Sequence, residues 1–173
     1  MKRWHMLTVV GRDRSGIVAA LTDALYRGGA NLGEASMTRL GGTFTIMLMV
    51  ESSIDAGGLA RLLDPIAEKF ELHLHFDSID GRLHAHVEPN VRVVVHGADR
   101  PGIVAQVTAA LAGQGFNILD LDSDVGGATD KPIYIMVLEG YADGGVEALE
   151  RAAAPLRAGG IEVRIAPIDV LVG

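Results

Sequence analysis

Two segments of the chain have nearly the same sequence, and together they determine its fold. The first, GRDRSGIVAALTDALYRGGANLGE, spans residues 11–34, and the second, GADRPGIVAQVTAALAGQGFNILD, spans residues 97–120. A shift of 86 positions aligns them, and 12 of the 21 positions from Gly11 to Asn31 are then identical. The chain is therefore predicted to contain one small domain twice.

Each copy predicts the same order of strands and helices. Short apolar or alternating runs bounded by glycine and other turn residues favour strands. Strands are expected at residues 4–10, 43–50 and 72–76, with one more beginning at Asn31, and at 91–96, 133–138 and 161–165, with one more beginning at Asn117. The edge strand over 72–76 is expected to point Leu72, Leu74 and Phe76 inward and His73 and His75 outward.

Two helices are expected in each copy. The first follows the Asp-Arg-x-Gly turn, carries apolar residues at helical spacing and is closed by Gly28-Gly29 or by Gly113-Gln-Gly115. The second lies between the third and last strands. It contains a proline, Pro65 or Pro155, which is expected to kink or restart it.

The resulting order, β-α-β-β-α-β twice, is the ferredoxin-like split βαβ motif. The fold class is therefore α+β, with two antiparallel sheets that each carry helices on one face. In this topology the first and third strands are central, which agrees with a third strand that is apolar on both faces. Because Met47 and Met49 point away from the helices, we expect a partner domain or a second subunit to cover that face.

The first domain is expected over residues 1–82, a linker over 83–89 and the second domain over 90–173. A turn-forming Asp-Gly pair and a proline lie within residues 79–90, IDGRLHAHVEPN, where the break between the copies belongs.

Composition narrows the possible functions. The chain has 173 residues, is 49% hydrophobic and carries a formal net charge of −7 with scattered basic residues, so we expect no direct nucleic-acid binding. It has no cysteine, which excludes disulfides and thiolate nucleophiles. With no apolar run long enough to span a bilayer and no signal-peptide core, we expect a cytoplasmic protein without membrane association.

Two βαββαβ units, each with a Gly-x-Asp-Arg-x-Gly-Ile-Val turn and an asparagine just after the first helix, resemble tandem ACT domains, small regulatory modules that often bind amino acids. The whole chain is similar to the family of the glycine cleavage system transcriptional repressor. The turn also resembles the N-terminal ACT module of formyltetrahydrofolate deformylase, in which a separate catalytic domain follows. No residues are left here for such a domain, so the resemblance implies regulation without catalysis.

The repeated turn suggests a binding site for a small amino acid. The start of the first helix suits a carboxylate, glycine allows close approach, aspartate accepts from an ammonium group, and asparagine offers both a donor and an acceptor. The candidate ligand-binding residues are Asp13, Gly16 and Asn31 in the first copy and Asp99, Gly102 and Asn117 in the second. In ACT domains that bind amino acids, the matching positions line the ligand site, usually where two domains meet.

Each candidate also has a structural alternative. The aspartates could be helix N-caps, the glycines could permit tight packing of helix against strand, and the asparagines could be left-handed exit residues. Arg14 and Arg100 are interpreted as partners in surface ion pairs. The sequence alone leaves these alternatives open.

Other polar groups give weaker signals. Two His-x-His pairs, at His73 and His75 and at His84 and His86, have a spacing that metals use, and Asp120, Asp122 and Asp124 alternate along one strand. Neither set is completed by further ligands in sequence, so solvated strand faces are the favoured interpretation and no metal or cofactor is expected. No catalytic triad, Gly-x-Ser-x-Gly motif or phosphate loop is present.

The sequence therefore predicts a non-enzymatic regulatory protein that binds a small amino acid and modulates a protein partner, with a homo-oligomer expected. The resemblance implies that this partner is a transcription regulator of glycine metabolism, through which DNA is reached. The alternative is a regulatory subunit or remnant of a folate or amino-acid enzyme whose catalysis lies on another chain.

Overall fold

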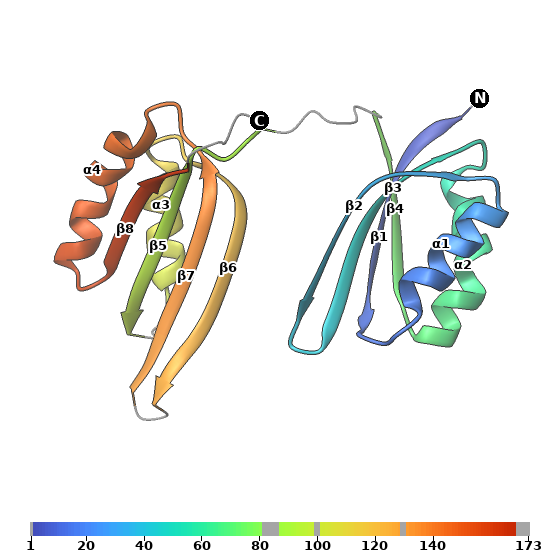
Figure 1. Cartoon of the computed structure of the whole chain (residues 1–173), viewed down its shortest axis with the longest axis horizontal. Helices are drawn as coiled ribbons and strands as arrows, with labels where there is room; N and C mark the ends of the chain where they lie inside the picture. Colours follow the sequence, from blue (N-terminus) through green and yellow to red (C-terminus); the bar gives the residue numbers. More distant parts are fainter. Residues whose placement is uncertain (1, 81–86, 99–100, 129–130, 169–173) are drawn as a thin grey trace. The chain divides into compact units, whose positions relative to one another are not determined.

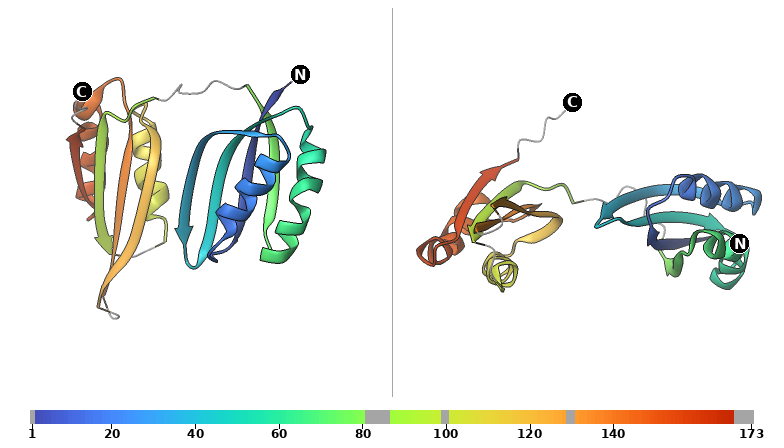
Figure 2. Two further views of the ribbon diagram at one scale, coloured as in Figure 1. Left: turned by 45° about the vertical axis from the view of Figure 1, so that its right-hand side comes forward. Right: turned by 90° about the horizontal axis from the view of Figure 1, so that it is seen from below.

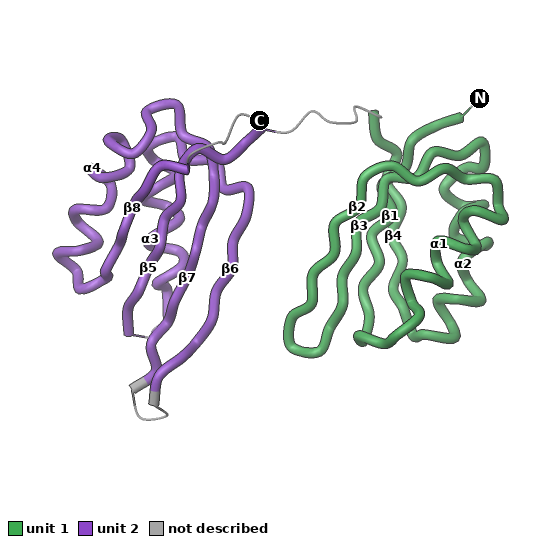
Figure 3. Tube along the Cα trace, viewed as in Figure 1, with its two compact units in different colours: residues 1–85 green, residues 86–173 purple. Residues whose placement is uncertain are grey.

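The structure is a computed structural model that describes residues 2–80, 87–98, 101–128 and 131–168. The chain divides into two compact units, residues 1–85 and 86–173 (Figure 3). Each unit consists of one sheet and two helices. No helix within the described ranges is long and apolar enough to cross a membrane.

Unit 1 has the predicted β-α-β-β-α-β order. Its elements are β1 (Arg3–Arg12), α1 (Ile17–Arg27), β2 (Asn31–Leu40), β3 (Thr43–Ser52), α2 (Ala56–Phe70) and β4 (His73–Ile79). The antiparallel sheet has the strand order β2-β3-β1-β4, so the first and third strands are central as predicted. Both helices cover the same face of this sheet (Figures 1 and 2).

Unit 2 repeats this architecture. Its elements are β5 (Val91–Ala98), α3 (Ile103–Ala112), β6 (Asn117–Ala128), β7 (Lys131–Tyr141), α4 (Gly145–Ala158) and β8 (Glu162–Pro167). Its sheet order is β6-β7-β5-β8, which matches unit 1 strand for strand. The predicted fold class, two ferredoxin-like units, is confirmed.

The core of each unit lies between the sheet and its two helices. In unit 1 the fully buried side chains include Leu7 of β1, Leu21 and Leu25 of α1 and Leu59 of α2. Burial of such apolar side chains supplies most of the driving force for folding. Alternation along β4 is as predicted, because Leu74 and Phe76 pack on this core while the two histidines are exposed.

The face of the unit 1 sheet away from its own helices is exposed in part. Met47 of β3 is 44% exposed there, whereas Met49 is 9% exposed. Both point away from the helices, since their neighbours Ile46 and Leu48 lie in the core. That a partner covers this face remains a prediction.

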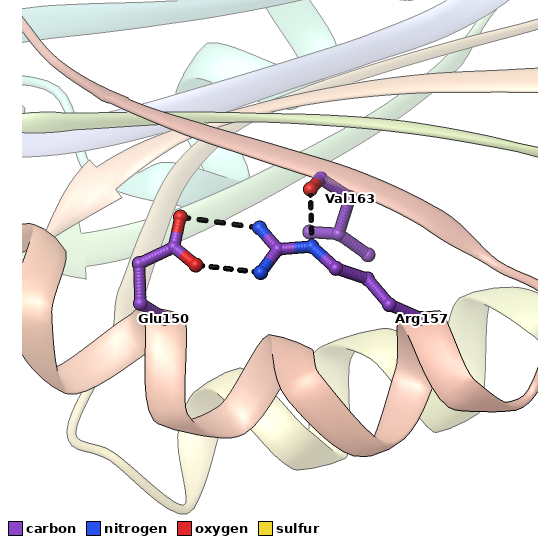
Figure 4. Close-up of polar contacts among 3 residues, drawn as sticks. All are labelled: Glu150, Arg157 and Val163. Carbon is purple, nitrogen blue, oxygen red and sulfur yellow. Dashed lines mark hydrogen bonds and ion pairs between the residues drawn. The ribbon is translucent and has the colours of Figure 1, made fainter.

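Helix α4 of unit 2 is tied to the neighbouring strand by an arginine. Arg157 donates from Nη1 and Nη2 to both carboxylate oxygens of Glu150, at 2.6 and 3.1 Å, and from Nε to the carbonyl oxygen of Val163 in β8, at 2.9 Å (Figure 4). The hydrogen bonds from Arg157 hold the pKa of Glu150 below its ordinary value. This fork-shaped contact joins two turns of α4 and the edge strand beside it.

The prolines do not restart either second helix. Pro65 lies inside α2, which runs unbroken over Ala56–Phe70, and Pro155 lies inside α4, unbroken over Gly145–Ala158. The expectation of a restart was wrong. A proline removes one backbone hydrogen bond, and packing of the apolar face holds the helix on both sides of it. Pro65 itself is exposed, so the carbonyl group that loses its partner is close to water.

Candidate ligand-binding site

The repeated turn of unit 1 ends in a glycine that begins helix α1. Gly16 is the N-cap residue with φ of 89°, and no side chain among the described residues makes a capping hydrogen bond there. A Cβ atom at Gly16 would meet no atom within 4 Å, so tight packing does not explain the glycine. Its positive φ does, because an L-residue is strained in the left-handed region.

Asp13 is not the helix cap that the sequence left as an alternative. Its backbone N–H donates to the carbonyl oxygen of Gly42 at 3.1 Å, which fixes the turn against the β2–β3 hairpin. Its carboxylate accepts from Nη1 of Arg39 at 3.0 Å. Arg14, next along the turn, makes the expected surface ion pair, with Glu71. The turn therefore holds Asp13 by backbone contacts and leaves its carboxylate facing a cation.

A β-bulge brings Arg39 to the turn. The pairing of β2 with β3 shifts between Leu32 and Ala35, so β2 has one residue more than its partner there. A one-residue shift moves every later side chain of a strand to the other face. Met37 and Arg39 consequently pair with the core residues Ile46 and Phe44 and lie on the helix side of the sheet, next to the start of α1.

These residues surround a pocket of about 260 Å³. It is lined by Asp13, Arg14, Ser15, Gly16, Ile17, Val18, Ala19, Met37, Arg39 and Phe44. One wall is the turn and the first residues of α1, where free N–H groups and the positive end of the helix dipole lie. The other wall combines an apolar floor from β2 and β3 with the guanidinium group of Arg39. The volume suits a ligand smaller than a drug-sized molecule, which takes roughly 300–1,000 Å³.

Asn31 lies at the far end of β2 from this pocket. It pairs with Glu51, whereas Arg39 pairs with Phe44, seven residues earlier in β3. At roughly 3.3 Å per residue the two ends are about 23 Å apart along the strand. Within one unit 1, therefore, the structure brings Asp13 and Gly16 together but not Asn31.

The asparagines are not left-handed exit residues either. Among the residues that the structure describes, Glu71 is the one non-glycine residue with positive φ. The left-handed positions after α1 and α3 are Gly29 and Gly115. The N–H of the following residue, Ala30 or Phe116, donates back to the carbonyl group of Leu25 or Leu111, which closes each helix in a Schellman-type end.

Unit 2 reproduces the start of the helix that follows the turn. Gly102 is the N-cap of α3 with φ of 88°, and Asn117 begins β6, where it pairs with Tyr141 at the far end of the sheet. Asp99 and Arg100 lie outside the described residues. The bulge is also present, between Ile118 and Asp120. The position of Arg39 is occupied by Val125, which pairs with Tyr134 as Arg39 pairs with Phe44.

The weaker polar signals do not assemble into a site. His73 and His75 are exposed on β4, and Nε2 of His75 lies 3.2 Å from Oδ1 of Asp77, while His84 and His86 lie outside the described residues. Asp122 and Asp124 are exposed on β6. In the described part of the chain, no three His, Cys, Asp or Glu side chains are grouped as metal ligands would be.

Two larger hollows occupy the same place in the two units. One, of about 490 Å³, is lined by Val10, Gly11, Arg12, Thr43, Glu71 and His73, and the other, of about 500 Å³, by His96, Gly97, Ile133, Gly160, Glu162 and Arg164. They lie where the first and last strands of each sheet meet. Because they recur with similar size but different side chains, they follow from the shared backbone and do not indicate a ligand.

Sequence reasoning missed Arg39 and Met37. Simple alternation from Leu32, which points to the core, would place both on the opposite face. The signal that could have revealed the bulge is Gly33, since a glycine inside a strand often marks one.

Comparison with known proteins agrees with this architecture. An ACT-domain family model matches residues 5–77, and a second ACT-domain model matches residues 91–154. The glycine cleavage system transcriptional repressor of Escherichia coli (strain K12) is 27% identical over 123 residues. That match covers 70% of this chain and 65% of the repressor, so the chain spans just under two thirds of that relative's length.

Two further matches differ in extent. The UPF0237 protein YjhC of Lactococcus lactis subsp. lactis (strain IL1403) is 47% identical over 47 residues, which is 27% of this chain and 54% of that protein. Among solved structures, an unknown protein from Galdieria sulphuraria has a TM-score of 0.77 at 22% identity, with 98% of this chain and 100% of that chain covered. At this identity the likeness shows the fold alone, and it extends over both units.

Proposed function

This chain belongs to the ACT-domain family, and on that basis we propose that it is a non-enzymatic regulatory protein that binds a small amino acid and modulates a protein partner. The Escherichia coli relative is named as a transcriptional repressor of the glycine cleavage system. The partner that we propose is accordingly a transcription regulator of glycine metabolism, through which DNA is reached. A net charge of −7 supports this indirect route.

The pocket at the turn of unit 1 is the observation that carries the proposal. It combines the free N–H groups at the start of α1, which suit a carboxylate, with the carboxylate of Asp13, which suits an ammonium group. Gly16 keeps the approach to the backbone open, since nothing lies within 4 Å of where its Cβ would be. By the repeat, we propose the same roles for Asp99 and Gly102.

Thermal shift with a panel of the common amino acids tests the ligand, with glycine and serine first. We expect at least one amino acid to raise the Tm of the full chain, because it binds the folded state. The increase should be lost in the double variant Asp13→Ala/Asp99→Ala. The matched control is Asp23→Ala, which also removes an exposed ion pair with an arginine, Arg27, at 3.0 Å but lies outside the pocket.

Either of two outcomes would count against this. If no amino acid shifts the Tm, the ligand-binding role fails and a purely structural interaction module is favoured. If the shift survives in the double variant, the ligand binds elsewhere.

We propose that Asn31 contributes to the pocket of a second copy of the chain. Strand β2 is an edge strand, so one of its sides has no strand partner in the described structure. Two β2 strands paired antiparallel about a twofold axis place the first residue of one beside the last residues of the other. Asn31 of the second copy would then reach the Arg39 end of β2, where the pocket lies. We propose the same arrangement for Asn117 at the edge strand β6.

Mixing of variants tests this homo-oligomer. Asn31→Ala should lose the part of the ligand response that belongs to unit 1, although Asn31 lies far from the pocket of its own chain. A 1:1 mixture of Asn31→Ala with Asp13→Ala chains should regain about a quarter of the unit 1 response, since about half of the randomly paired dimers are mixed and each of these has both wild-type residues in one of its two pockets. Sedimentation gives the oligomeric state. A monomer, or an Asn31→Ala chain that responds normally, would contradict the arrangement.

Affinity capture with and without the amino acid tests the partner. We expect a DNA-binding protein whose capture changes when the amino acid is added, because a ligand shifts an equilibrium through its different affinities for two states. Capture of a metabolic enzyme in its place would favour the regulatory-subunit alternative.

A further inference from the structure

The two repeats share the glycine that begins the first helix and the bulge of the next strand, but they differ at the strand position of Arg39. Arg39 of β2 and Val125 of β6 are related by the 86-residue shift of the repeat. The pairing registers agree, since each follows its bulge and each lies opposite an aromatic residue of the next strand, Phe44 or Tyr134. The equivalence is therefore structural as well as sequential.

In unit 1 this position supplies a positive charge to the pocket, in addition to Arg14, which is paired with Glu71. Nη1 of Arg39 donates to Asp13 at 3.0 Å, and the Arg39 and Asp13 side chains are 65% and 37% exposed. An ion pair this exposed contributes little to stability, about 0–1 kcal/mol. A guanidinium group has five N–H donors, so Arg39 can bind a carboxylate from a ligand as well as Asp13, or in exchange for it.

Opposite charges across one pocket favour a ligand that carries both. With the pocket empty, Asp13 and Arg39 neutralise each other. A zwitterion can give an ammonium group to Asp13 and a carboxylate to Arg39, so neither residue is left unpaired. A simple anion or a simple cation satisfies one residue and leaves the other without its partner.

The equivalent strand of unit 2 has no means of holding a carboxylate. Val125 replaces Arg39, and β6 contains no lysine or arginine. It carries three acidic residues instead, of which Asp122 and Asp124 lie on the face opposite Val125. The negative charges of Asp122 and Asp124 repel an incoming anion, although solvent screens this repulsion across the sheet.

We infer that the two repeats have diverged in ligand affinity: the unit 1 pocket, through Arg39 and Asp13, is the tight zwitterion site of the chain, and the unit 2 turn, with Val125 in place of the arginine, binds the same molecule at least about tenfold more weakly. This rests on the proposed amino-acid-binding function and refines it. Arg39 is the residue that determines specificity for the carboxylate.

Calorimetric titration of the full chain tests the inference. The probes are the common amino acids one at a time, then acetate and methylammonium, each on the wild type and on Arg39→Ala, Arg39→Lys and Val125→Ala. Arg39 is largely exposed, so its variants should fold, and circular dichroism checks this. Val125→Ala changes the equivalent position of the other repeat and is the matched control.

We expect one tight site per chain, with acetate and methylammonium both weaker than the amino acid. Arg39→Ala should weaken amino-acid binding at least about tenfold, which is the loss of one hydrogen bond to a charged group. Arg39→Lys should recover part of the affinity, because it keeps the charge without the planar fork. Val125→Ala should bind like the wild type.

The contrary results separate the two proposals. Two sites of equal affinity per chain, or an Arg39→Ala chain that binds as tightly as the wild type, would overturn the division between the turns and leave the amino-acid-binding function standing. If no amino acid binds the wild type at all, both fall together.

Discussion

The first helices of unit 1 and unit 2 begin in the same way, but the edge strands that follow them carry different side chains. Both begin a helix with a left-handed glycine, Gly16 at φ of 89° and Gly102 at φ of 88°, and both precede a bulged edge strand. On that common frame unit 1 places an arginine and unit 2 a valine. The glycine that begins the helix is present in both copies, whereas the strand residue at the position of Arg39 differs.

The edge strands differ in the same way. On the face away from the helices, β2 presents Ser36 and Thr38, whereas β6 presents Asp122 and Asp124. Charges on an edge strand oppose pairing with another chain, and at these two positions β2 is uncharged. We therefore expect two copies of the chain to pair more strongly through β2 than through β6.

The largest expected loss of stability comes from core substitutions, which test whether the cores of the two units are equally well packed. Leu25 of α1 and Leu111 of α3 occupy the same repeat position and are both 0% exposed. Leu25→Ala and Leu111→Ala should each lower the free energy of unfolding of their own unit by about 2–5 kcal/mol, through lost burial and a cavity. Hydrogen exchange of the α1 and α3 amides reports each unit separately.

The exposed neighbour Tyr26→Ala is the control, because Tyr26 is 77% exposed. A loss below about 1 kcal/mol for either leucine would show that the equivalent core position is not equally packed in the two units.

A smaller effect should distinguish the two units, because the side-chain hydrogen bonds of Asn90 have no counterpart at Trp4, the equivalent position of unit 1. The side chain of Asn90 donates to the carbonyl oxygen of Ala142 and accepts from its N–H, both at 3.0 Å. The repeat places Trp4 at this position in unit 1. Asn90→Ala should cost unit 2 about 1–3 kcal/mol, because two part-buried backbone groups lose their partners.

Urea unfolding measures the loss at Asn90. Asn117→Ala, measured without ligand, is the control, since this asparagine of the same unit is exposed. Equal effects of the two substitutions would mean that the paired hydrogen bonds of Asn90 add nothing.

The turn glycines should respond alike in both units. Gly16→Ala and Gly102→Ala should each cost about 1–2 kcal/mol, which is the strain of an L-residue in the left-handed region. Neither added Cβ would clash, because the nearest atom is Nε2 of Gln106, 3.6 Å from a Cβ at Gly102.

Thermal denaturation measures the cost at these glycines. Gly126→Ala is the matched control, since its Cβ would also lie in open space and its φ is not in the left-handed region. If Gly16→Ala proves as neutral as the control, positive φ is not what the turn requires.

The smallest effect depends on pH and concerns the Arg157 contact of unit 2. Glu150→Gln should lower the stability by at most about 1 kcal/mol at pH 7, because the pair is partly exposed. Arg157 lowers the pKa of Glu150 in the folded state from its ordinary value of 4.5. The contribution of the carboxylate is therefore complete well above pH 4.5 and is lost as the pH falls through the lowered folded pKa.

Urea unfolding of the wild type and of Glu150→Gln between pH 3 and pH 7 follows this difference. It should shrink toward zero at the acid end. Glu88→Gln, an exposed glutamate outside the helices, is the control. A difference that grows as the pH falls would have the wrong sign and would contradict the assignment to Glu150.

Much of the fold followed from local sequence rules. The repeat gave two units, and hydrophobic periodicity gave the order of elements and the central position of β1 and β3. The prediction that the second helices restart at Pro65 and Pro155 was wrong. Local helix propensity does not include the packing that holds a helix together on both sides of a proline. Of the candidate site, the sequence identified Asp13 and Gly16 at a common turn.

By itself, then, the sequence determined that one small βαββαβ unit occurs twice, that each copy begins a helix at a glycine after an Asp-Arg turn, and that no cysteine chemistry is available. Only the tertiary structure decided that Arg39 faces Asp13 and that Asn31 lies at the other end of the strand. Both depend on strand register, and one extra residue near Gly33 changes the face of everything after it. Register is set by pairing between strands, which no local stretch of sequence contains.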